Sequence, residues 1–267
     1  MLSTDKSWEK FGRDQPYFGV LADEKFTPEK IQHNRDEFFA SGQGAVSQIL
    51  GRCETHFGDL RRERALDHGC GVGRLTFALA GQFASVVALD VSPSMLTEAK
   101  ANAARFGVSN VIFDLADDRL SNADGTFDFV NSHMVLQHIR VRRGLRVASR
   151  LLGKVRPGGG FNLHFSIRTD GLRSRSLWWA SHHVPGVKLF QNVCAGRAWN
   201  APAMQMNDYP LNRIVALLAS RGIAEFLIST EKHAQFRTLS VTGKLPERCE
   251  AERCETANLT DGHTADT

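Results

Sequence analysis

A loop of three glycines is the first feature whose residue types and spacing could do chemistry. Gly69, Gly71 and Gly73 lie in residues 67–74 (DHGCGVGR), directly after a short apolar run. Glycine lets a backbone turn sharply and approach a ligand closely, and between a strand and a helix such a loop can cradle a nucleotide-bearing ligand. Asp90 follows about 20 residues later, at the end of the next apolar run, where a carboxylate can accept hydrogen bonds from ribose hydroxyls. The spacing predicts a ligand that contains a nucleoside.

The details of the loop narrow the kind of ligand. A dinucleotide fingerprint, GxGxxG, needs Gly or Ala at its sixth position, where this chain has Arg74. The loop reads GxGxG instead, and an acid, Asp67, precedes it. This pattern resembles the first motif of the class I (Rossmann-fold) S-adenosylmethionine-dependent methyltransferases of the small-molecule type, whose ligand has no pyrophosphate. The alternative is a tight turn that binds no ligand.

The resemblance covers about residues 60–166 and includes four further segments in the family's order. These are Leu89–Leu96, Asp117-Asp118, Thr126–Val130 and Val155–Gly159. Arg156 stands where the family more often has Lys, and this leaves the Pro-Gly-Gly turn unaffected.

The resemblance implies how the cofactor S-adenosyl-L-methionine, and its product S-adenosyl-L-homocysteine, would be held. The glycine loop lines the methionine part and Asp67 orients that end. Asp90 holds the ribose, Met95 covers one face of the adenine, and Asp117 reaches the adenine amino group, with Asp114 as the alternative. The implied cofactor residues are Asp67, Gly69, Cys70, Gly71, Gly73, Asp90, Val91, Met95, Asp117, Asp118 and His133.

Alternating strands and helices must position these residues. Apolar runs predict strands at 64–67, 85–89, 110–114, 127–132, 161–166, 223–229 and 236–242. Helical spacing and caps predict helices at 27–40, 44–57, 74–81, 92–106, 141–154 and 210–221, the first two divided at Ser41-Gly42. The pattern indicates an α/β fold with a doubly wound, mostly parallel seven-stranded sheet, a Rossmann-like methyltransferase core.

The core is expected to carry additions at three places. Residues 1–62 are an N-terminal lid and helical extension, of which 1–26 read as irregular and rich in aromatics. Residues 63–243 form the core, and a cap or acceptor insertion interrupts it at 167–208, after the fifth strand. Residues 244–267 are acidic, lack periodicity and are expected to be disordered.

Methyl transfer is an in-line displacement at a sulfonium methyl, for which an enzyme mainly supplies proximity and alignment. A hydroxyl acceptor must also lose its proton, most often to His, Asp or Glu. His133 and His138 follow the predicted strand 127–132 and are the candidate bases. The alternative is that His133 shapes the cofactor pocket while His138 packs and caps. His164 lies inside a predicted strand and is expected to be a core histidine.

Aromatic and basic residues gather in the insertion, which makes it the candidate acceptor-binding element. Aromatics supply apolar contact area and Arg can bind an anionic group through two hydrogen bonds. The alternatives are a dimer interface or an inert cap, and for the two tyrosines simple packing. The candidate acceptor residues are Tyr17, Trp178, Trp179, His182, Arg197 and Tyr209.

Composition sets limits on partners. The 267 residues carry a net charge of +4 without a concentrated basic face, so no nucleic-acid partner is expected. The arginines at 142, 146 and 150 share one helix face, which is interpreted as solvated rather than RNA-binding. No apolar run approaches the roughly 18 residues of a membrane span, and no metal-ligand spacing is present. The expected protein is cytoplasmic, a monomer or homodimer, and binds no membrane or metal.

The favoured function is transfer of a methyl group to a small-molecule acceptor, at oxygen, with a histidine assisting deprotonation. The acceptor is expected to carry an acidic group, because the insertion is net basic. N-methylation is one alternative, although residues 131–134 (NSHM) lack an NPPY-like tetrapeptide. The others are a non-methylating enzyme of the same cofactor, for decarboxylation or cyclisation, and a non-catalytic cofactor-binding subunit.

Overall fold

The computed structural model describes residues 4–169, 204–233 and 236–247 of the chain. The insertion candidates Trp178, Trp179, His182 and Arg197 lie outside the described residues, as does most of the predicted tail. Among the described residues, no helix combines the length and apolar character that crossing a membrane requires.

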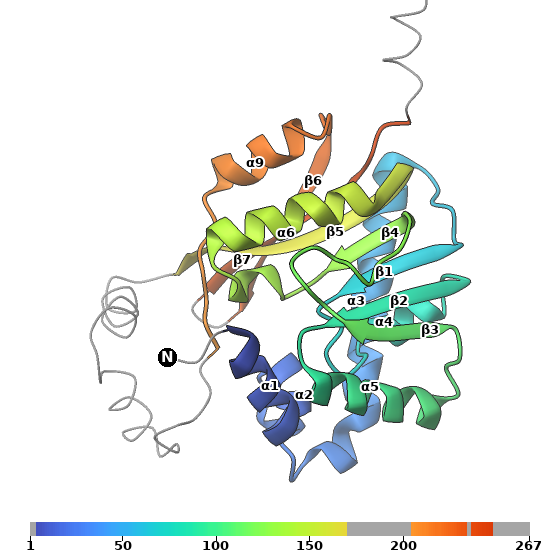
Figure 1. The fold of residues 1–267 in the computed structure, drawn as a ribbon, viewed down its shortest axis with the longest axis vertical. Helices are drawn as coiled ribbons and strands as arrows, with labels where there is room; N and C mark the ends of the chain where they lie inside the picture. Colours follow the sequence, from blue (N-terminus) through green and yellow to red (C-terminus); the bar gives the residue numbers. More distant parts are fainter. Residues whose placement is uncertain (1–3, 170–203, 234–235, 248–267) are drawn as a thin grey trace, which may run out of the picture.

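A seven-stranded sheet runs through the described part of the chain in the order β3-β2-β1-β4-β5-β7-β6 (Figure 1). Strands β1 to β5 are parallel, whereas β7 is antiparallel to both β5 and β6. The predicted doubly wound, mostly parallel fold is therefore confirmed. The strands are β1 (Arg64–His68), β2 (Ser85–Asp90), β3 (Val111–Leu115), β4 (Phe127–Ser132), β5 (Val155–Thr169), β6 (Phe226–His233) and β7 (Phe236–Lys244).

Helices cover both faces of the sheet and bury two apolar cores. The helices after β1 are α4 (Thr76–Ala80), α5 (Pro93–Phe106), the short 3-10 turn η2 (Leu136–His138), α6 (Val141–Lys154) and α9 (Leu211–Ala219). One core joins the sheet to α6 and α9, with Phe127, Leu151 and Leu218 fully buried. The other joins the opposite face to α4 and to the N-terminal helix α3 (Ile31–Phe57) (Figure 1). Because both faces are covered, apolar residues of the central strands are buried on either side of the sheet.

Helix α5 shows why local signals located the elements well. Ser92 accepts a hydrogen bond from the Met95 amide at the N-cap, Pro93 occupies the first turn, and Gly107 ends the helix at φ +66°. Each residue satisfies an end requirement of a helix without help from the rest of the fold. The helix predicted at 92–106 is accordingly confirmed.

The prediction that residues 1–26 are irregular is wrong. Residues 4–26 form α1 (Thr4–Asp14), α2 (Pro16–Val20) and a 3-10 turn η1 (Glu24–Phe26). Their aromatics, among them Phe11 and Tyr17, pack with Phe38 and Phe39 of α3 into a buried cluster that also contains Met95. Tertiary burial of these rings, and not a local periodic pattern, stabilises the short helices.

The predicted break at Ser41-Gly42 is also wrong, because α3 runs unbroken from Ile31 to Phe57. Gly42 is needed for close packing: a Cβ at this position would lie 2.1 Å from the backbone oxygen of Arg74. The glycine therefore lets α3 approach the loop that follows β1, and the helix tolerates its low propensity.

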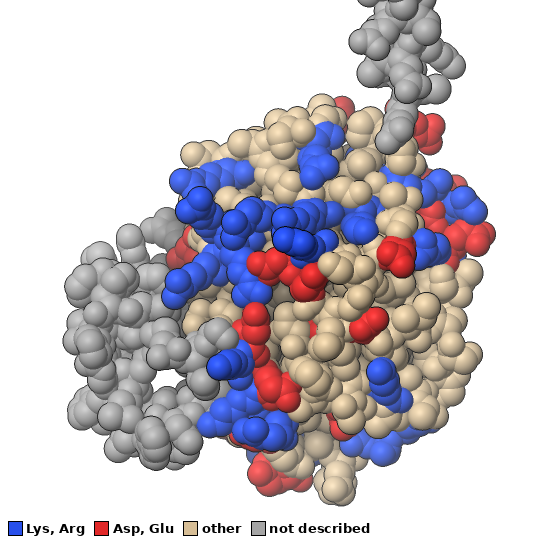
Figure 2. All heavy atoms as spheres, in the orientation of Figure 1, with Lys and Arg blue, Asp and Glu red and all other residues tan. Residues whose placement is uncertain are grey.

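Basic side chains gather over α6, as Figure 2 shows. Arg142, Arg146 and Arg150 are exposed, in agreement with the solvated face that their spacing indicates. Arg143 differs, because its guanidinium forms ion pairs with Asp5 of α1 and with Asp118.

Candidate functional site

The glycine loop leaves the carboxyl end of β1 and leads into α4. Gly69 and Gly71 have φ of +76° and +53°, in the left-handed region that favours glycine. A Cβ on Gly69 would lie 2.2 Å from Cγ2 of Val135, and one on Gly71 would lie 2.6 Å from Cγ2 of Val20. The loop is thus enclosed by α2 and by the segment after β4, and it has room for glycine only. Gly73 also has a positive φ, of +95°.

Asp90 ends β2 and faces this loop. Its Oδ2 accepts a hydrogen bond from the Gly71 amide at 2.8 Å, and its Oδ1 accepts one from the Ser92 amide at 2.9 Å. The side chain is buried, and burial raises the pKa of this carboxyl to about 6 against the opposing effect of the two amides. The structure therefore brings the predicted ribose residue into contact with the predicted methionine loop.

Asp67 is buried beneath the loop at the end of β1. Its Oδ2 accepts a hydrogen bond from Oγ1 of Thr76 at 2.7 Å, and its Oδ1 accepts one from Nδ2 of Asn131 at 2.8 Å. Burial raises its pKa, while the two hydrogen bonds and the charge of Arg74 oppose the rise. Two buried carboxylates near one loop form an electronegative site that suits a cationic ligand.

The remaining predicted cofactor residues in the loop and in α5 are covered by the N-terminal helices. Met95 is 1% exposed, and a Cβ on Gly12 or Gly19 would lie 3.0 or 3.1 Å from its side chain. Cys70 is buried, which raises its thiol pKa well above the ordinary value. Val91 is half-buried between β2 and α5. Helices α1 and α2 therefore lie directly over the edge where the predicted site forms.

The two acids after β3 have different partners. Asp117 is exposed and accepts hydrogen bonds from the backbone and the hydroxyl of Ser121, both at 2.8 Å, which lower its pKa. Asp118 binds Nε of Arg143 at 2.8 Å, and the same guanidinium binds Asp5 of α1 at 3.0 Å. Asp117 thus stabilises a local turn, whereas Asp118 is connected through Arg143 to α1.

The two candidate bases differ in burial. His133 follows β4, is half-buried, and its ring centroid lies 4.7 Å from that of the fully buried His164. His138 is buried in η2, where its Nδ1 donates to the backbone oxygen of Gln205 at 2.7 Å. Burial lowers the pKa of His138 to about 4, so its ring is neutral at pH 7. Its contacts favour the packing role that the sequence left open.

Both tyrosines proposed for the acceptor are buried, with their hydroxyls engaged. The Tyr17 hydroxyl lies 2.6 Å from Oε1 of Glu98 and 2.9 Å from Oδ1 of Asn102, and burial raises its pKa to about 12. The Tyr209 hydroxyl donates toward the backbone oxygens of Leu136 and Ile139, at 2.8 and 2.9 Å. These contacts favour packing over acceptor binding.

Sequence reasoning missed the contribution of α1 to this edge. The Glu9 carboxylate accepts hydrogen bonds from the hydroxyls of Ser92 and Ser94, at 2.8 and 2.6 Å, and from the Ser94 amide. The ring of Trp8 lies 4.9 Å from that of His138. Contacts across more than 80 residues leave no periodic or motif signal, so no sequence pattern could have revealed them.

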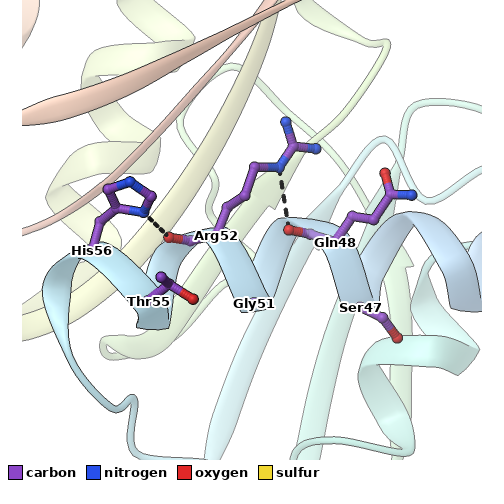
Figure 3. A pocket seen from close by; sticks show the side chains of 6 residues that line it. All are labelled: Ser47, Gln48, Gly51, Arg52, Thr55 and His56. Atoms are coloured by element: carbon purple, nitrogen blue, oxygen red, sulfur yellow. Dashed lines mark hydrogen bonds between the residues drawn. The ribbon is translucent and has the colours of Figure 1, made fainter.

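A hollow on the outer side of α3 lies apart from the predicted site and is lined by none of the candidate site residues (Figure 3). It is lined by Ser47, Gln48, Gly51, Arg52, Thr55 and His56. Nε of Arg52 donates to the backbone oxygen of Gln48, and Nδ1 of His56 donates to the backbone oxygen of Arg52. Among the described residues, no cluster of His, Cys, Asp and Glu is suited to hold a metal ion.

Comparisons with known proteins agree with this arrangement. Residues 65–159 match a family model described as a methyltransferase domain. A ubiquinone biosynthesis O-methyltransferase from Burkholderia ambifaria is 34% identical over 126 residues, 47% of this chain and 52% of that protein. A 23S rRNA (uracil(1939)-C(5))-methyltransferase from Shewanella amazonensis is 41% identical over 75 residues, 28% of this chain and 16% of that protein. The chain thus spans about half or less of the length of these relatives.

A solved structure shares the fold across most of the chain. The magnesium protoporphyrin IX methyltransferase of Synechocystis PCC 6803, with bound S-adenosylhomocysteine, superposes with a TM-score of 0.59 at 19% identity. The match covers 90% of this chain and 97% of that one. The matched family model includes the glycine loop, Asp90 and the strand that leads to His133.

Proposed function

We propose that this protein is a class I methyltransferase that transfers a methyl group from S-adenosylmethionine to a small-molecule acceptor, because residues 65–159 match a methyltransferase domain. The observation that carries the proposal is the contact between Asp90 and Gly71 at the carboxyl edge of the parallel strands. Ligands of open α/β sheets bind at that edge. The spacing of Asp90 and Gly71 in the sequence, the hydrogen bond between them and the matched domain all support a cofactor site at this edge.

The residues present fit this cofactor. The loop at Gly69 and Gly71 would offer its backbone to the ligand, and a side chain at either position would collide with Val135 or Val20 and displace the loop. Asp90 would hold the ribose hydroxyls, and Asp67 would bind the amino group of the methionine end. Met95 would lie against the adenine, and Asp118 is joined through Arg143 to Asp5 of the covering helix α1. When bound, the cofactor supplies an electrophilic sulfonium methyl.

The chain's own contribution to the reaction is alignment and exclusion of water. Helices α1 and α2 cover the glycine loop and Met95, and Glu9 and Arg143 hold α1 in that position. A covered site keeps the acceptor oriented toward the methyl group, and proximity of this kind can lower a barrier by about 7–11 kcal/mol in favourable cases. Residues 1–62 are therefore proposed to act as a lid, and 63–243 as the catalytic core.

We propose oxygen as the methylated atom and His133 as the base. The relative from Burkholderia ambifaria is named an O-methyltransferase, which favours oxygen. His133 is half-buried at the carboxyl edge of β4, whereas Nδ1 of His138 is committed to Gln205. His133 would take the acceptor's hydroxyl proton as the oxygen attacks the methyl carbon. An acidic group on the acceptor remains a proposal that rests on the basic composition of residues 167–208.

Methyl transfer can be tested with methyl-tritiated S-adenosylmethionine and a panel of small phenols, hydroxy acids and amines. The proposal predicts S-adenosylhomocysteine formation with a hydroxyl-bearing acceptor. His133→Ala should slow turnover roughly 10²–10⁴-fold while binding of S-adenosylhomocysteine persists. His33→Ala, at an exposed position of α3, is the matched control. Full turnover by His133→Ala would remove the base, and absence of product with the whole panel would favour a non-catalytic subunit.

A further inference from the structure

A row of buried polar side chains crosses the sheet beneath the proposed cofactor site. The strand register places Asp67 beside Asn131, Asn131 beside Asn162, and Asn162 beside Thr242. The row therefore extends over β1, β4, β5 and β7, and every member is at most 3% exposed. Polar groups in the middle of a sheet cost free energy unless they are hydrogen-bonded, so a continuous row calls for a reason.

The hydrogen bonds of the row all point in one direction. Oδ1 of Asn162 accepts from the hydroxyls of Ser240 and Thr242, and Nδ2 of Asn162 donates to Oδ1 of Asn131 at 2.9 Å. Nδ2 of Asn131 then donates to Oδ1 of Asp67 at 2.8 Å. Each amide thus accepts from the β7 side and donates toward β1, and the last acceptor is a carboxylate.

The two ends of the row fix this direction. An ionised carboxylate only accepts hydrogen bonds, so Asn131 must present its NH₂ group to Asp67. At the other end, two hydroxyl donors meet the oxygen of Asn162, which leaves its NH₂ group for Asn131. Thr76 donates to the second oxygen of Asp67 from α4. The carboxylate is therefore held from two sides, with lone pairs left over for a ligand.

We infer that Asn131, Asn162 and Ser240 are positioning residues that hold Asp67 to receive the amino group of the cofactor's methionine end. The inference rests on the proposed function and adds to it, because all three residues lie on strands other than β1, which leads into the glycine loop. Asn162 and Ser240 would act through Asn131 and touch no ligand. Their effect should fall on the amino-acid end of the ligand and leave its adenosine end unaffected.

Two ligands distinguish positioning from general structural support. S-adenosylhomocysteine carries the amino-acid end, whereas 5′-methylthioadenosine keeps the adenosine and thioether but lacks it. Asn162→Asp keeps the size of the side chain and removes the donor to Asn131. We expect this variant to bind S-adenosylhomocysteine about tenfold more weakly by calorimetry. Without the donor from residue 162, Asn131 no longer holds the charged Asp67 through its hydrogen bond. Binding of 5′-methylthioadenosine should stay within about twofold of the wild type.

Asn110→Asp is the matched control. Asn110 donates to backbone oxygens of Ala80 and Phe83, outside the row, so its substitution should perturb the fold without changing the ratio of the two affinities. If Asn162→Asp fails to fold, Ser240→Ala combined with Thr242→Val removes the two donors at the far end and should shift the ratio in the same direction. Equal weakening of both ligands, or of neither, would overturn the inference. Failure of the wild type to bind S-adenosylhomocysteine would instead contradict the proposed function.

Discussion

Two buried histidines should make the stability of this fold depend on pH. His68 lies at the end of β1 with Nδ1 3.1 Å from Oγ of Ser132, and His138 donates to Gln205. Burial lowers the pKa of each to about 4. In the unfolded chain a histidine takes up its proton near pH 6.5. The unfolded state therefore binds protons first as the pH falls, and stability is full above pH 6.5 and lost progressively toward pH 4.

The size of the effect follows from these pKa values. Between pH 7 and pH 5, each histidine should cost about 2 kcal/mol of folding free energy. Asp90 acts in the opposite sense, because its pKa of about 6 lies above the unfolded value, so the folded state binds that proton first. It should return about 1 kcal/mol over the same interval. The net loss from the three groups is on the order of 2–3 kcal/mol.

Urea unfolding followed by circular dichroism at pH 7 and pH 5 would measure this. His68→Asn and His138→Asn each keep a donor near the Nδ1 position but cannot titrate, so each should reduce the loss by about 2 kcal/mol. The exposed His33→Asn should unfold with the wild-type dependence on pH. If both buried variants also kept the wild-type dependence, the burial argument would be refuted.

Three further substitutions test the site. Gly69→Ala places a Cβ 2.2 Å from Val135 in a left-handed backbone, and should remove the rise in melting temperature that S-adenosylhomocysteine gives the wild type. Tyr209→Phe removes the hydroxyl that donates to the carbonyls of Leu136 and Ile139 and should cost about 1–2 kcal/mol in urea unfolding, with the acceptor KM unchanged if the tyrosine only packs. Arg143→Gln breaks the ion pairs to Asp5 and Asp118 that hold α1. The variant should release S-adenosylhomocysteine faster in stopped-flow measurements, and an unchanged rate would show that α1 does not retain the cofactor.

The parts of the fold that the sequence predicts correctly are those with local causes. Ser92, Pro93 and Gly107 satisfy the ends of α5 by themselves, and the apolar run at 85–89 needs only a covered sheet. Gly42 misled the prediction because its reason is the approach of α3 to Arg74, which is distant in sequence. The N-terminal helices were missed because burial of their aromatic rings stabilises them.

The contacts of the site likewise fall into those that the sequence predicts and those that only the folded structure shows. The contact of Asp90 with the glycine loop follows from a spacing that the fold imposes, so residue order alone predicts it. Glu9 on Ser94, and the row from Thr242 to Asp67, depend on which side chains meet across the folded sheet. Tyr209 could be singled out as a rare residue, but only the structure shows its hydroxyl occupied by backbone oxygens.

The most direct test of the account is calorimetric titration of S-adenosylhomocysteine into the wild type and Asp90→Ala. The account predicts one binding site per chain in the wild type. It predicts affinity weaker by about a hundredfold in the variant, since two hydrogen bonds from the ribose to a charged group are lost. Absence of binding to the wild type, or equal affinity of the two proteins, would contradict the claim that the cofactor binds at the sheet edge where Asp90 meets the glycine loop.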